Sequence, residues 1–202
     1  MTRAPVIVRR ARPVERSDIA AVLASAFATD PVMSWLVGRE RDVASRLRHL
    51  FSHSLGVELH RADHLVDTVD SGQAVALWHE VDEWKATNAD VVKTGPAAIR
   101  TFGRHLPRAL RTNMTIEAVH PGEPHRYLAY LGVHPDRQGE GLGGALLASM
   151  TEDCDERGIA AYLESSNPRN EPLYARYGFV SRGPIELPVG APEIIAMWRD
   201  PR

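Results

Sequence analysis

Residues 127–144 read YLAYLGVHPDRQGEGLGG, and this stretch decides the fold. Residues 127–133 are apolar throughout, which is typical of a strand that is covered on both faces and is therefore central in its sheet. A glycine-rich turn follows, after which residues 142–154 place apolar side chains at helical spacing and Gly158 supplies a C-terminal cap. Residues 159–163 have the pattern of another strand. The stretch therefore predicts a strand–helix–strand unit with a right-handed crossover.

The rest of the chain adds helices and strands around this unit. Apolar spacing predicts helices over residues 17–27 and 42–60. Residues 64–69 and 73–79 predict two strands joined by a short link that contains Gly72. The remaining segments are a strand over residues 6–8, a break at Asp30-Pro31, a helix over residues 97–110, a short helix over residues 173–177, and closing strands over residues 179–181 and 194–198. The chain reads as α/β, and its length predicts a single domain over residues 1–202.

Composition excludes several classes of function. Hydrophobic residues make up 44% of the 202 residues and charged residues 25%, as in an average soluble protein. The formal net charge of −2 argues against a broad basic surface for nucleic acid. No run of about 18 apolar residues and no export signal is seen, so we expect no membrane partner. Cys154 is the only cysteine, which excludes an internal disulfide and is compatible with a cytoplasmic location.

The glycine-rich turn has the form of an anion-binding loop. Because it lies between a strand and a helix, its backbone amides and the helix N-terminus can surround a phosphate, and glycine lets that phosphate approach. A loop for nucleoside triphosphate hydrolysis would end in Gly-Lys-Ser or Gly-Lys-Thr, whereas this one ends in Gly143-Gly144-Ala145. The turn therefore predicts a phosphate-bearing ligand of another kind.

A dinucleotide-binding loop stays open as an alternative. Gly139, Gly141 and Gly144 satisfy its spacing, and Glu164 follows about 20 residues on, where an acid would bind a ribose. Against this, residues 134–138 separate the strand from the first glycine, and only one strand–helix–strand unit is visible. A dinucleotide-dependent oxidoreductase is the weaker alternative.

Two motifs in this order resemble the GNAT N-acetyltransferases. Gln138-Gly-Glu-Gly141-Leu-Gly143 matches the family's Q/R-x-x-G-x-G/A acetyl-CoA loop, and Asn167, Tyr174 and Gly178-Phe179 match its N-x6-Y-x3-G-F pattern. Within the superfamily, residues 163–179 look most like the actinobacterial puromycin N-acetyltransferase group. The resemblance implies the GNAT fold, an α/β architecture whose central, mostly antiparallel mixed sheet is flanked by helices and splayed at the acetyl-CoA site.

The resemblance also implies acetyl-CoA as cofactor and a set of residues around it. The backbone of residues 131–133 would pair with the pantetheine arm, and Gly132 would permit a bulge that opens the site. Glu140 carries a charge that opposes phosphate binding unless its side chain points to solvent. Asn167 and Asn170 would bind the amide arm, although each could equally be a helix N-cap. The candidate cofactor-binding residues are Leu131, Val133, Gln138, Gly139, Gly141, Leu142, Gly143, Gly144, Asn167 and Asn170.

Catalysis by direct acetyl transfer needs an acid and a base. By the same resemblance, Tyr174 would protonate the leaving thiolate. The attacking amine must first lose a proton, and Glu164, Glu117 and His134 are the candidate bases. Glu164 ranks first because it lies on the strand beside the cofactor strand. We therefore expect Tyr174 and Glu164 to be the catalytic residues.

The expected acceptor is the primary amine of a small molecule. Aromatic side chains that could surround such an amine are Phe27, Trp35, Trp78 and Tyr130. We expect no metal, because the histidine pairs at helical spacing have no carboxylate or cysteine nearby to complete a set of ligands. The chain is expected to be a monomer or homodimer, and a non-catalytic acetyl-CoA-binding module is the alternative to an enzyme.

Overall fold

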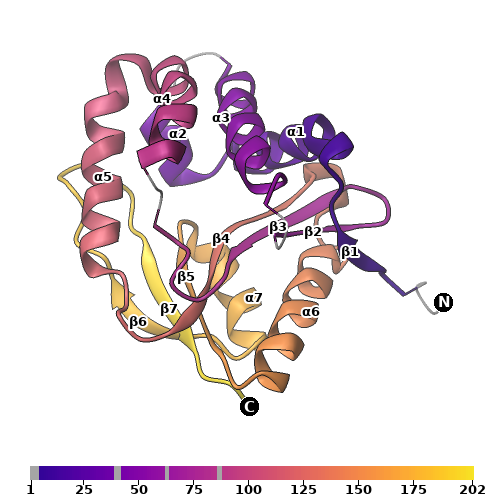
Figure 1. The fold of residues 1–202 in the computed structure, drawn as a ribbon. Coiled ribbons are helices and arrows are strands. Elements are labelled where there is room, and N and C mark those ends of the chain that lie inside the picture. Colours follow the sequence, from indigo (N-terminus) through magenta and orange to yellow (C-terminus); the bar gives the residue numbers. More distant parts are fainter. Residues whose placement is uncertain (1–4, 39–41, 62–63, 86–87) are drawn as a thin grey trace.

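The computed structural model describes residues 5–38, 42–61, 64–85 and 88–202. A seven-stranded sheet runs through this part of the chain in the order β1-β2-β3-β4-β5-β7-β6 (Figure 1). Its strands are β1 (Val8–Arg10), β2 (Leu65–Val69), β3 (Ala74–His79), β4 (His125–Val133), β5 (Ala160–Ser165), β6 (Val180–Pro184) and β7 (Ile195–Arg199). Strands β4 and β5 are parallel, and the other neighbours pair antiparallel. The predicted mostly antiparallel mixed sheet is confirmed.

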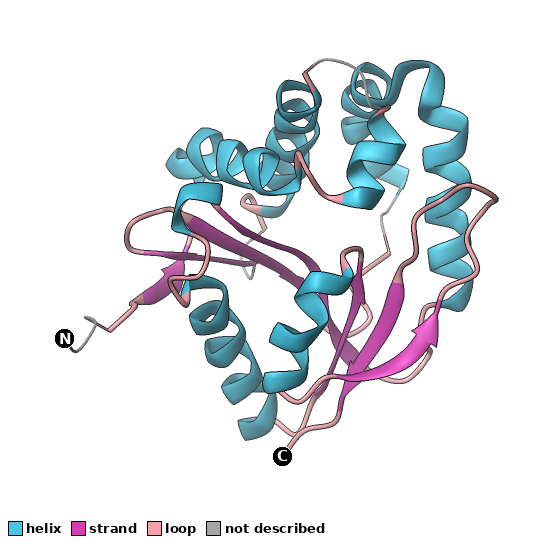
Figure 2. Ribbon diagram, turned by 180° about the vertical axis from the view of Figure 1, so that it is seen from behind, coloured by secondary structure: helices cyan, strands magenta, loops and turns pink. Residues whose placement is uncertain are grey.

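Helices cover both faces of the sheet. Helices α1 to α5 lie on one face, and α6 and α7 lie on the other (Figures 1 and 2). Their bounds are α1 (Arg16–Phe27), α2 (Pro31–Val37), α3 (Val43–Glu58), α4 (Asn88–Phe102), α5 (Leu106–Val119), α6 (Leu142–Glu156) and α7 (Glu171–Arg176). Each face has its own hydrophobic cluster, and neighbouring strand residues alternate between them: Leu77 packs with the α1–α5 layer and Trp78 with the α6 layer.

No single helix in the described ranges is long and apolar enough to cross a membrane. The segments Pro13–Phe27 and Pro31–Val37 meet that test together, as a bent pair and by length and composition only.

Two helical regions differ from the sequence-based expectation. The break expected at Asp30-Pro31 is instead the start of α2, because Asp30 accepts hydrogen bonds from the amides of Val32 and Met33 and the proline occupies the first turn. The single helix expected over residues 97–110 is two helices. Gly103, with a φ of +50°, begins a 3-10 turn that separates α4 from α5.

The sheet opens between β4 and β5. These strands pair from His125 opposite Ala160 as far as Leu128 opposite Leu163, and β4 then continues to Val133 without β5 beside it. All residues of β3 pair with β4, but the register shifts between two neighbouring pairs. Leu77 faces Tyr130, whereas Trp78 faces Leu128. Ala129 therefore has no partner on β3 and forms a bulge. A bulge increases local twist and bends a strand. The predicted splay of the sheet is therefore confirmed, with the bulge at its start.

Gly132 has a different role from the one expected. It pairs in regular register with Val75, three residues beyond the bulge. A Cβ at this position would lie 2.8 Å from Cδ2 of Leu23 and 3.2 Å from Cβ of Ala26. The glycine therefore lets α1 pack directly on β4, and the bulge lies at Ala129 instead, next to the last β4 residue that pairs with β5.

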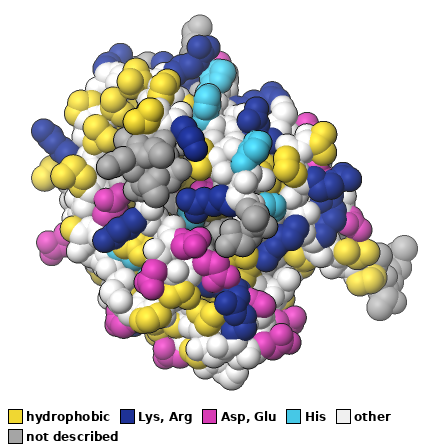
Figure 3. Space-filling model, in the orientation of Figure 1, with side chains coloured by type: hydrophobic (Ala, Val, Ile, Leu, Met, Phe, Trp, Pro, Cys, Tyr) yellow, Lys and Arg dark blue, Asp and Glu magenta, His cyan; other side chains and the backbone are white. Residues whose placement is uncertain are grey.

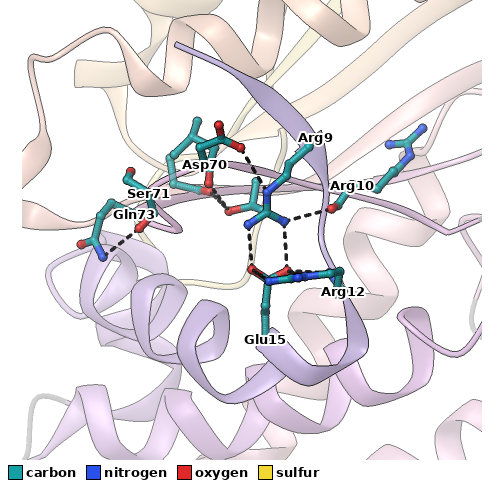
Figure 4. A network of polar contacts seen from close by, with 10 residues as sticks. Arg9, Arg10, Arg12, Glu15, Asp70, Ser71 and Gln73 are labelled. Atoms are coloured by element: carbon teal, nitrogen blue, oxygen red, sulfur yellow. Dashed lines mark hydrogen bonds and ion pairs between the residues drawn. The ribbon is translucent and has the colours of Figure 1, made fainter.

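A network of ion pairs fastens the outer edge of the sheet to α1 (Figure 4). The Arg9 guanidinium of β1 contacts the Glu15 carboxylate at 2.7 Å and the Asp70 carboxylate at 3.3 Å. Glu15 also accepts a 2.8 Å hydrogen bond from the backbone amide of Arg12. The network ties β1 and the β2–β3 turn to the start of α1, whose other end contributes Phe27 to the site.

Candidate active site

A cavity of about 660 Å³ lies where the sheet opens. The unpaired end of β4, the end of β5 and α7 form one side of it, and helices α1 to α5, β3 and the segment that follows β3 contribute most of the rest. Ile99 and Leu110 line this cavity and are also 60% and 55% exposed, so the cavity reaches the surface at the corner of α4 and α5. Hydrophobic side chains gather over that corner in Figure 3. The wall includes these predicted site residues: Phe27, Tyr130, Leu131, Glu164, Asn170 and Tyr174.

The glycine-rich loop follows directly from the open end of β4. Gly139 and Gly141 have φ values of +76° and +84°, and a Cβ at either would meet no atom within 4 Å. Backbone conformation, rather than lack of space, therefore calls for glycine here. The first turn of α6, which begins at Leu142, leaves its backbone amides without helical carbonyl partners. These amides can receive an anion.

Side chains of the loop hold it in place. The side-chain amide of Gln138 donates a 3.3 Å hydrogen bond to the backbone carbonyl oxygen of Val133, the last residue of β4. Glu140 accepts from Arg137 at 2.7 Å, so its charge is matched within the loop. The repulsion expected from Glu140 is thus reduced by an ion pair and not by exposure to solvent.

The start of α6 is packed too closely for larger residues. A Cβ on Gly144 would lie 2.6 Å from the Tyr177 hydroxyl oxygen, and one on Gly143 would lie 3.3 Å from Cγ2 of Val133. These two glycines therefore bring the helix N-terminus against β4 and the end of α7. Leu142, beside them, is buried in the core under this face of the sheet.

Tyr174 lines the cavity from α7 and is 8% exposed. Burial raises the pKa of its phenol well above the ordinary value, and the nearby carboxylate of Asp30 raises it further. The hydroxyl group is therefore protonated at neutral pH and able to donate. Phe179 packs its ring against Tyr174 with centroids 6.2 Å apart, which fixes the phenol.

Asp30 is a part of this wall that the sequence did not reveal as a site residue. Its carboxylate caps α2 and also accepts a 2.6 Å hydrogen bond from the hydroxyl of Ser166, which follows β5. Burial raises the pKa of this carboxyl group, and its three hydrogen bonds lower it less. Asp30 thus joins the helical layer to the end of β5 beside the cavity. A sequence signal existed, because Asp before Pro is a helix-start pattern.

Glu164 faces the same cavity in an enclosed position. Its side chain is 6% exposed, and its Oε1 atom is buried without a hydrogen-bond partner among the described residues. Nδ1 of His120 lies 3.5 Å from that oxygen. Burial raises the pKa of the Tyr127 phenol well above the ordinary value, and the Glu164 carboxylate adds to this rise. The hydroxyl groups of Tyr127 and Tyr162 also interact with this carboxylate, whose Oε1 is the acceptor atom left without a hydrogen bond among the described residues.

The other expected bases lie elsewhere. Glu117 is on the exposed face of α5, where it accepts a hydrogen bond from Asn113. His134 lies at the beginning of the loop, beside the β2–β3 turn, and accepts from the amide of Asp136. Neither lines the cavity. Within the described ranges, no group of three His, Cys, Asp or Glu side chains is placed to hold a metal ion.

The two asparagines have different positions. Asn167 is a cap, because its side-chain oxygen accepts from the amide of Arg169 at 3.1 Å. Asn170 precedes α7 without a side-chain cap bond and lines the cavity. Of the two alternatives left open by the sequence, the structure thus gives Asn167 the capping contact and leaves Asn170 facing the site.

The predicted aromatic residues divide in the same way. Phe27 and Tyr130 line the cavity, with ring centroids 5.9 Å apart. Trp78 does not, since strand alternation directs it to the α6 face, where it is 2% exposed. Trp35 packs outside the cavity wall with the Arg108 guanidinium over its ring. Trp84 lines the cavity instead, from the segment after β3 that the sequence left unassigned.

Comparison with known proteins agrees with this geometry. The model of the acetyltransferase (GNAT) family matches residues 109–179, which run from α5 through the glycine-rich loop to the residue before β6. An uncharacterized N-acetyltransferase of Schizosaccharomyces pombe is 28% identical over 88% of this chain and 76% of its own length. The mycothiol acetyltransferase of Propionibacterium freudenreichii is 30% identical over 84% of this chain, which spans only 65% of that relative.

A solved structure extends the likeness to the whole fold. The histone acetyltransferase HPA2 and related acetyltransferase from Corynebacterium glutamicum has a TM-score of 0.71 and 28% identity, and the match covers 98% of this chain and 97% of that one. The opened sheet, the glycine-rich loop, the family model and these relatives together support the place of this chain in the GNAT acetyltransferase superfamily.

Proposed function

We propose that the protein transfers the acetyl group of acetyl-CoA directly to a primary amine of a small molecule. The observation that carries the proposal is that three features adjoin along β4: its unpaired end, the glycine-rich loop that follows it at the N-terminus of α6, and a cavity that holds Tyr174 and Glu164. GNAT enzymes use acetyl-CoA, which supplies the acetyl group.

The residues present fit this cofactor. The amides of residues 139–144 would hold the diphosphate at the positive end of α6. The free edge of residues 131–133 would pair with the pantetheine arm as an added strand. A backbone N–H of this edge would stabilise the developing oxyanion. Both binding elements follow one another along the chain, so the diphosphate site and the open strand are held in fixed register.

Tyr174 and Glu164 would move the protons of the reaction. The protonated phenol of Tyr174 is available to donate to the leaving thiolate. The Glu164 carboxylate has an unused acceptor atom at the cavity and would take the proton of the incoming ammonium group. The presence of both groups in one cavity favours an enzyme over a module that only binds acetyl-CoA.

The residues that line the cavity favour an acceptor amine with an apolar or aromatic body. Most of its wall is hydrophobic, with the rings of Phe27, Tyr130 and Trp84 among it, while Glu164 adds a carboxylate that suits an ammonium group. Enclosure by the helical layer favours a small molecule over the amino group of a folded protein. An aminonucleoside of the puromycin type is one such amine, and the likeness of residues 163–179 to that group supports testing it first.

The proposal is tested by release of CoA thiol from acetyl-CoA in the presence of amines. The panel contains puromycin, 2-phenylethylamine, spermidine and an aminoglycoside. We expect release above background with an amine that carries an apolar or aromatic body. Release with none of the amines contradicts small-molecule acetyl transfer, and release with spermidine alone contradicts the acceptor class assigned from the cavity wall.

A further inference from the structure

A row of three side chains leads away from the cavity behind Glu164. Oε1 of Glu164 lies 3.5 Å from Nδ1 of His120, and Nε2 of His120 lies 3.0 Å from Nε2 of His125. Nδ1 of His125 is 2.6 Å from the backbone carbonyl oxygen of Glu123. Neither histidine lines the cavity itself, so Glu164 is the member of the row that an acceptor could touch.

The carbonyl at the far end fixes the direction of every hydrogen in the row. A carbonyl oxygen can only accept, so Nδ1 of His125 carries its hydrogen. Burial lowers the pKa of His125, which keeps the ring neutral and leaves its Nε2 without a hydrogen. The short contact between the two rings then requires the hydrogen of His120 to be on Nε2. In its neutral form His120 would therefore present a bare Nδ1 to Glu164.

Two acceptors consequently face each other in an enclosed space. The side chains of His120 and Glu164 are 1% and 6% exposed. Trp84 stacks on the His120 ring with centroids 3.6 Å apart, and the rings of Tyr127 and Tyr162 meet it edge-on. A bare Nδ1 opposite a carboxylate is unfavourable until a proton joins them. A Trp face also stabilises the imidazolium that forms when the proton moves to His120.

We propose that Glu164 and His120 act as one proton-accepting pair for the acceptor amine, and that His125 positions the pair by fixing the tautomer of His120. The inference rests on the proposed function. The ammonium group of the acceptor gives one proton to Glu164, which shares it with Nδ1 of His120. The freed amine then forms the N–C bond as the C–S bond breaks. The second nitrogen proton goes to the leaving thiolate by way of Tyr174, and the first returns to solvent when the product leaves.

The tautomers can be read by two-bond ¹H–¹⁵N correlation spectra of protein labelled at its histidine rings. Spectra are recorded above the ordinary histidine pKa of about 6.5, where neutral rings dominate. His120→Gln and His125→Phe assign the two rings by loss of their signals. We expect Nε2–H on His120 and Nδ1–H on His125. Nδ1–H on His120 in the wild type would overturn the proposal, because Nδ1 would then donate to Glu164 and could not accept a proton from it.

The variants separate positioning from simple packing. His125→Phe fills the same space but accepts no hydrogen bond, so His120 should switch to the Nδ1–H form that donates to Glu164. Glu164→Gln should retain Nε2–H, because its amide can donate to Nδ1. His53→Gln, on the exposed side of α3, is the matched control and should change neither ring. An unchanged His120 tautomer in folded His125→Phe protein contradicts the role of His125.

Folding and function are followed on the same samples. Thermal unfolding shows whether His125→Phe folds, and if it does not, the wild-type tautomers decide alone. Calorimetry with acetyl-CoA tests the proposed function independently. Absence of acetyl-CoA binding would count against acetyl transfer whatever the tautomers are, whereas reversed tautomers in a protein that binds acetyl-CoA would remove only the Glu164–His120 pair.

Discussion

Burial favours the functional protonation state of the Tyr174 phenol and opposes that of the neighbouring Asp30 carboxyl group. For Tyr174, the raised pKa keeps a proton on the phenol, which is the form a proton donor needs. For Asp30, burial opposes the ionised form that caps α2. The same wall of the cavity therefore favours the chemistry at one residue and costs stability at the other.

Replacing Tyr174 by phenylalanine removes the donor and keeps the ring that packs on Phe179. We expect turnover in the acetyl transfer assay to fall by about 10²- to 10⁴-fold, the usual contribution of a positioned acid. The Kd for acetyl-CoA by calorimetry should stay within about twofold, because the phenol is not among the groups that hold the diphosphate. Equal turnover in both proteins would contradict the role of Tyr174 as acid.

The Asp30 carboxyl gives a prediction for stability against pH. The native pKa of this carboxyl group is raised above the unfolded value of about 3.9. At a pH between the unfolded and the native pKa, the folded state therefore binds more protons than the unfolded state. Wild-type stability should therefore fall relative to Asp30→Asn as pH rises through this window. Urea unfolding across the pH range measures the free energy of unfolding of both proteins. A wild-type value that rises relative to that of Asp30→Asn as pH rises would contradict the raised pKa.

Asp30→Ala is the matched partner of that variant. Asparagine keeps an oxygen for the amides of Val32 and Met33, whereas alanine leaves both unpaired. We expect alanine to cost about 1–2 kcal/mol more than asparagine, the usual range for loss of an N-cap. Equal stabilities for the two variants would show that the cap does not hold α2.

At the scale of elements, the approach of α6 to Tyr177 can be tested through Gly144. Gly144→Ala gains about 1 kcal/mol of helix propensity, but its Cβ would lie 2.6 Å from the Tyr177 hydroxyl oxygen. In a Tyr177→Phe background the nearest ring carbon is 3.5 Å away, which is an ordinary contact. We expect the double variant to be more stable than the sum of the single changes by about 1 kcal/mol in urea unfolding. Additive effects would contradict the close packing.

The sequence predicted those elements whose pattern is local. Residues 127–163 read correctly as strand, loop, helix and strand, because a buried strand and an amphipathic helix leave distinct periods. Helix α2 was missed because Asp30-Pro31 both ends one helix and starts the next. The bulge at Ala129 left no local signal, since it arises from the pairing of β4 with β3.

The candidate site divides along the same line. The glycine-rich loop was identified by spacing along the chain, and Tyr174 by the resemblance of the segment around it to the GNAT motif. The contact between Glu164 and His120 joins segments that are distant in sequence, and nothing in the spacing of His120 and His125 around Pro121 points to it. Trp78 was assigned to the acceptor site by residue type alone. Neighbouring residues of a strand point to opposite faces of the sheet, so Leu77 faces the α1–α5 layer and Trp78 faces α6.

For the whole molecule, the parts of the site adjoin one opening in the sheet. Where β4 and β5 separate, β4 gains a free edge, the cavity gains its floor, and the loop that follows β4 is held at the N-terminus of α6. Binding of acetyl-CoA should depend on the loop conformation. Gly141→Ala places a side chain at a φ of +84°, which costs about 1–2 kcal/mol and should weaken the Kd roughly tenfold.

The central claim is that the amides of residues 139–144 bind the diphosphate of acetyl-CoA, and calorimetry tests it most directly. Wild-type protein is titrated with acetyl-CoA and, separately, with NAD, alongside Gly141→Ala and the control Gly122→Ala, whose glycine has no positive φ. We predict binding of acetyl-CoA by the wild type and the control, weaker binding by Gly141→Ala, and none of NAD. Binding of NAD by a protein that gives no heat with acetyl-CoA would contradict the account.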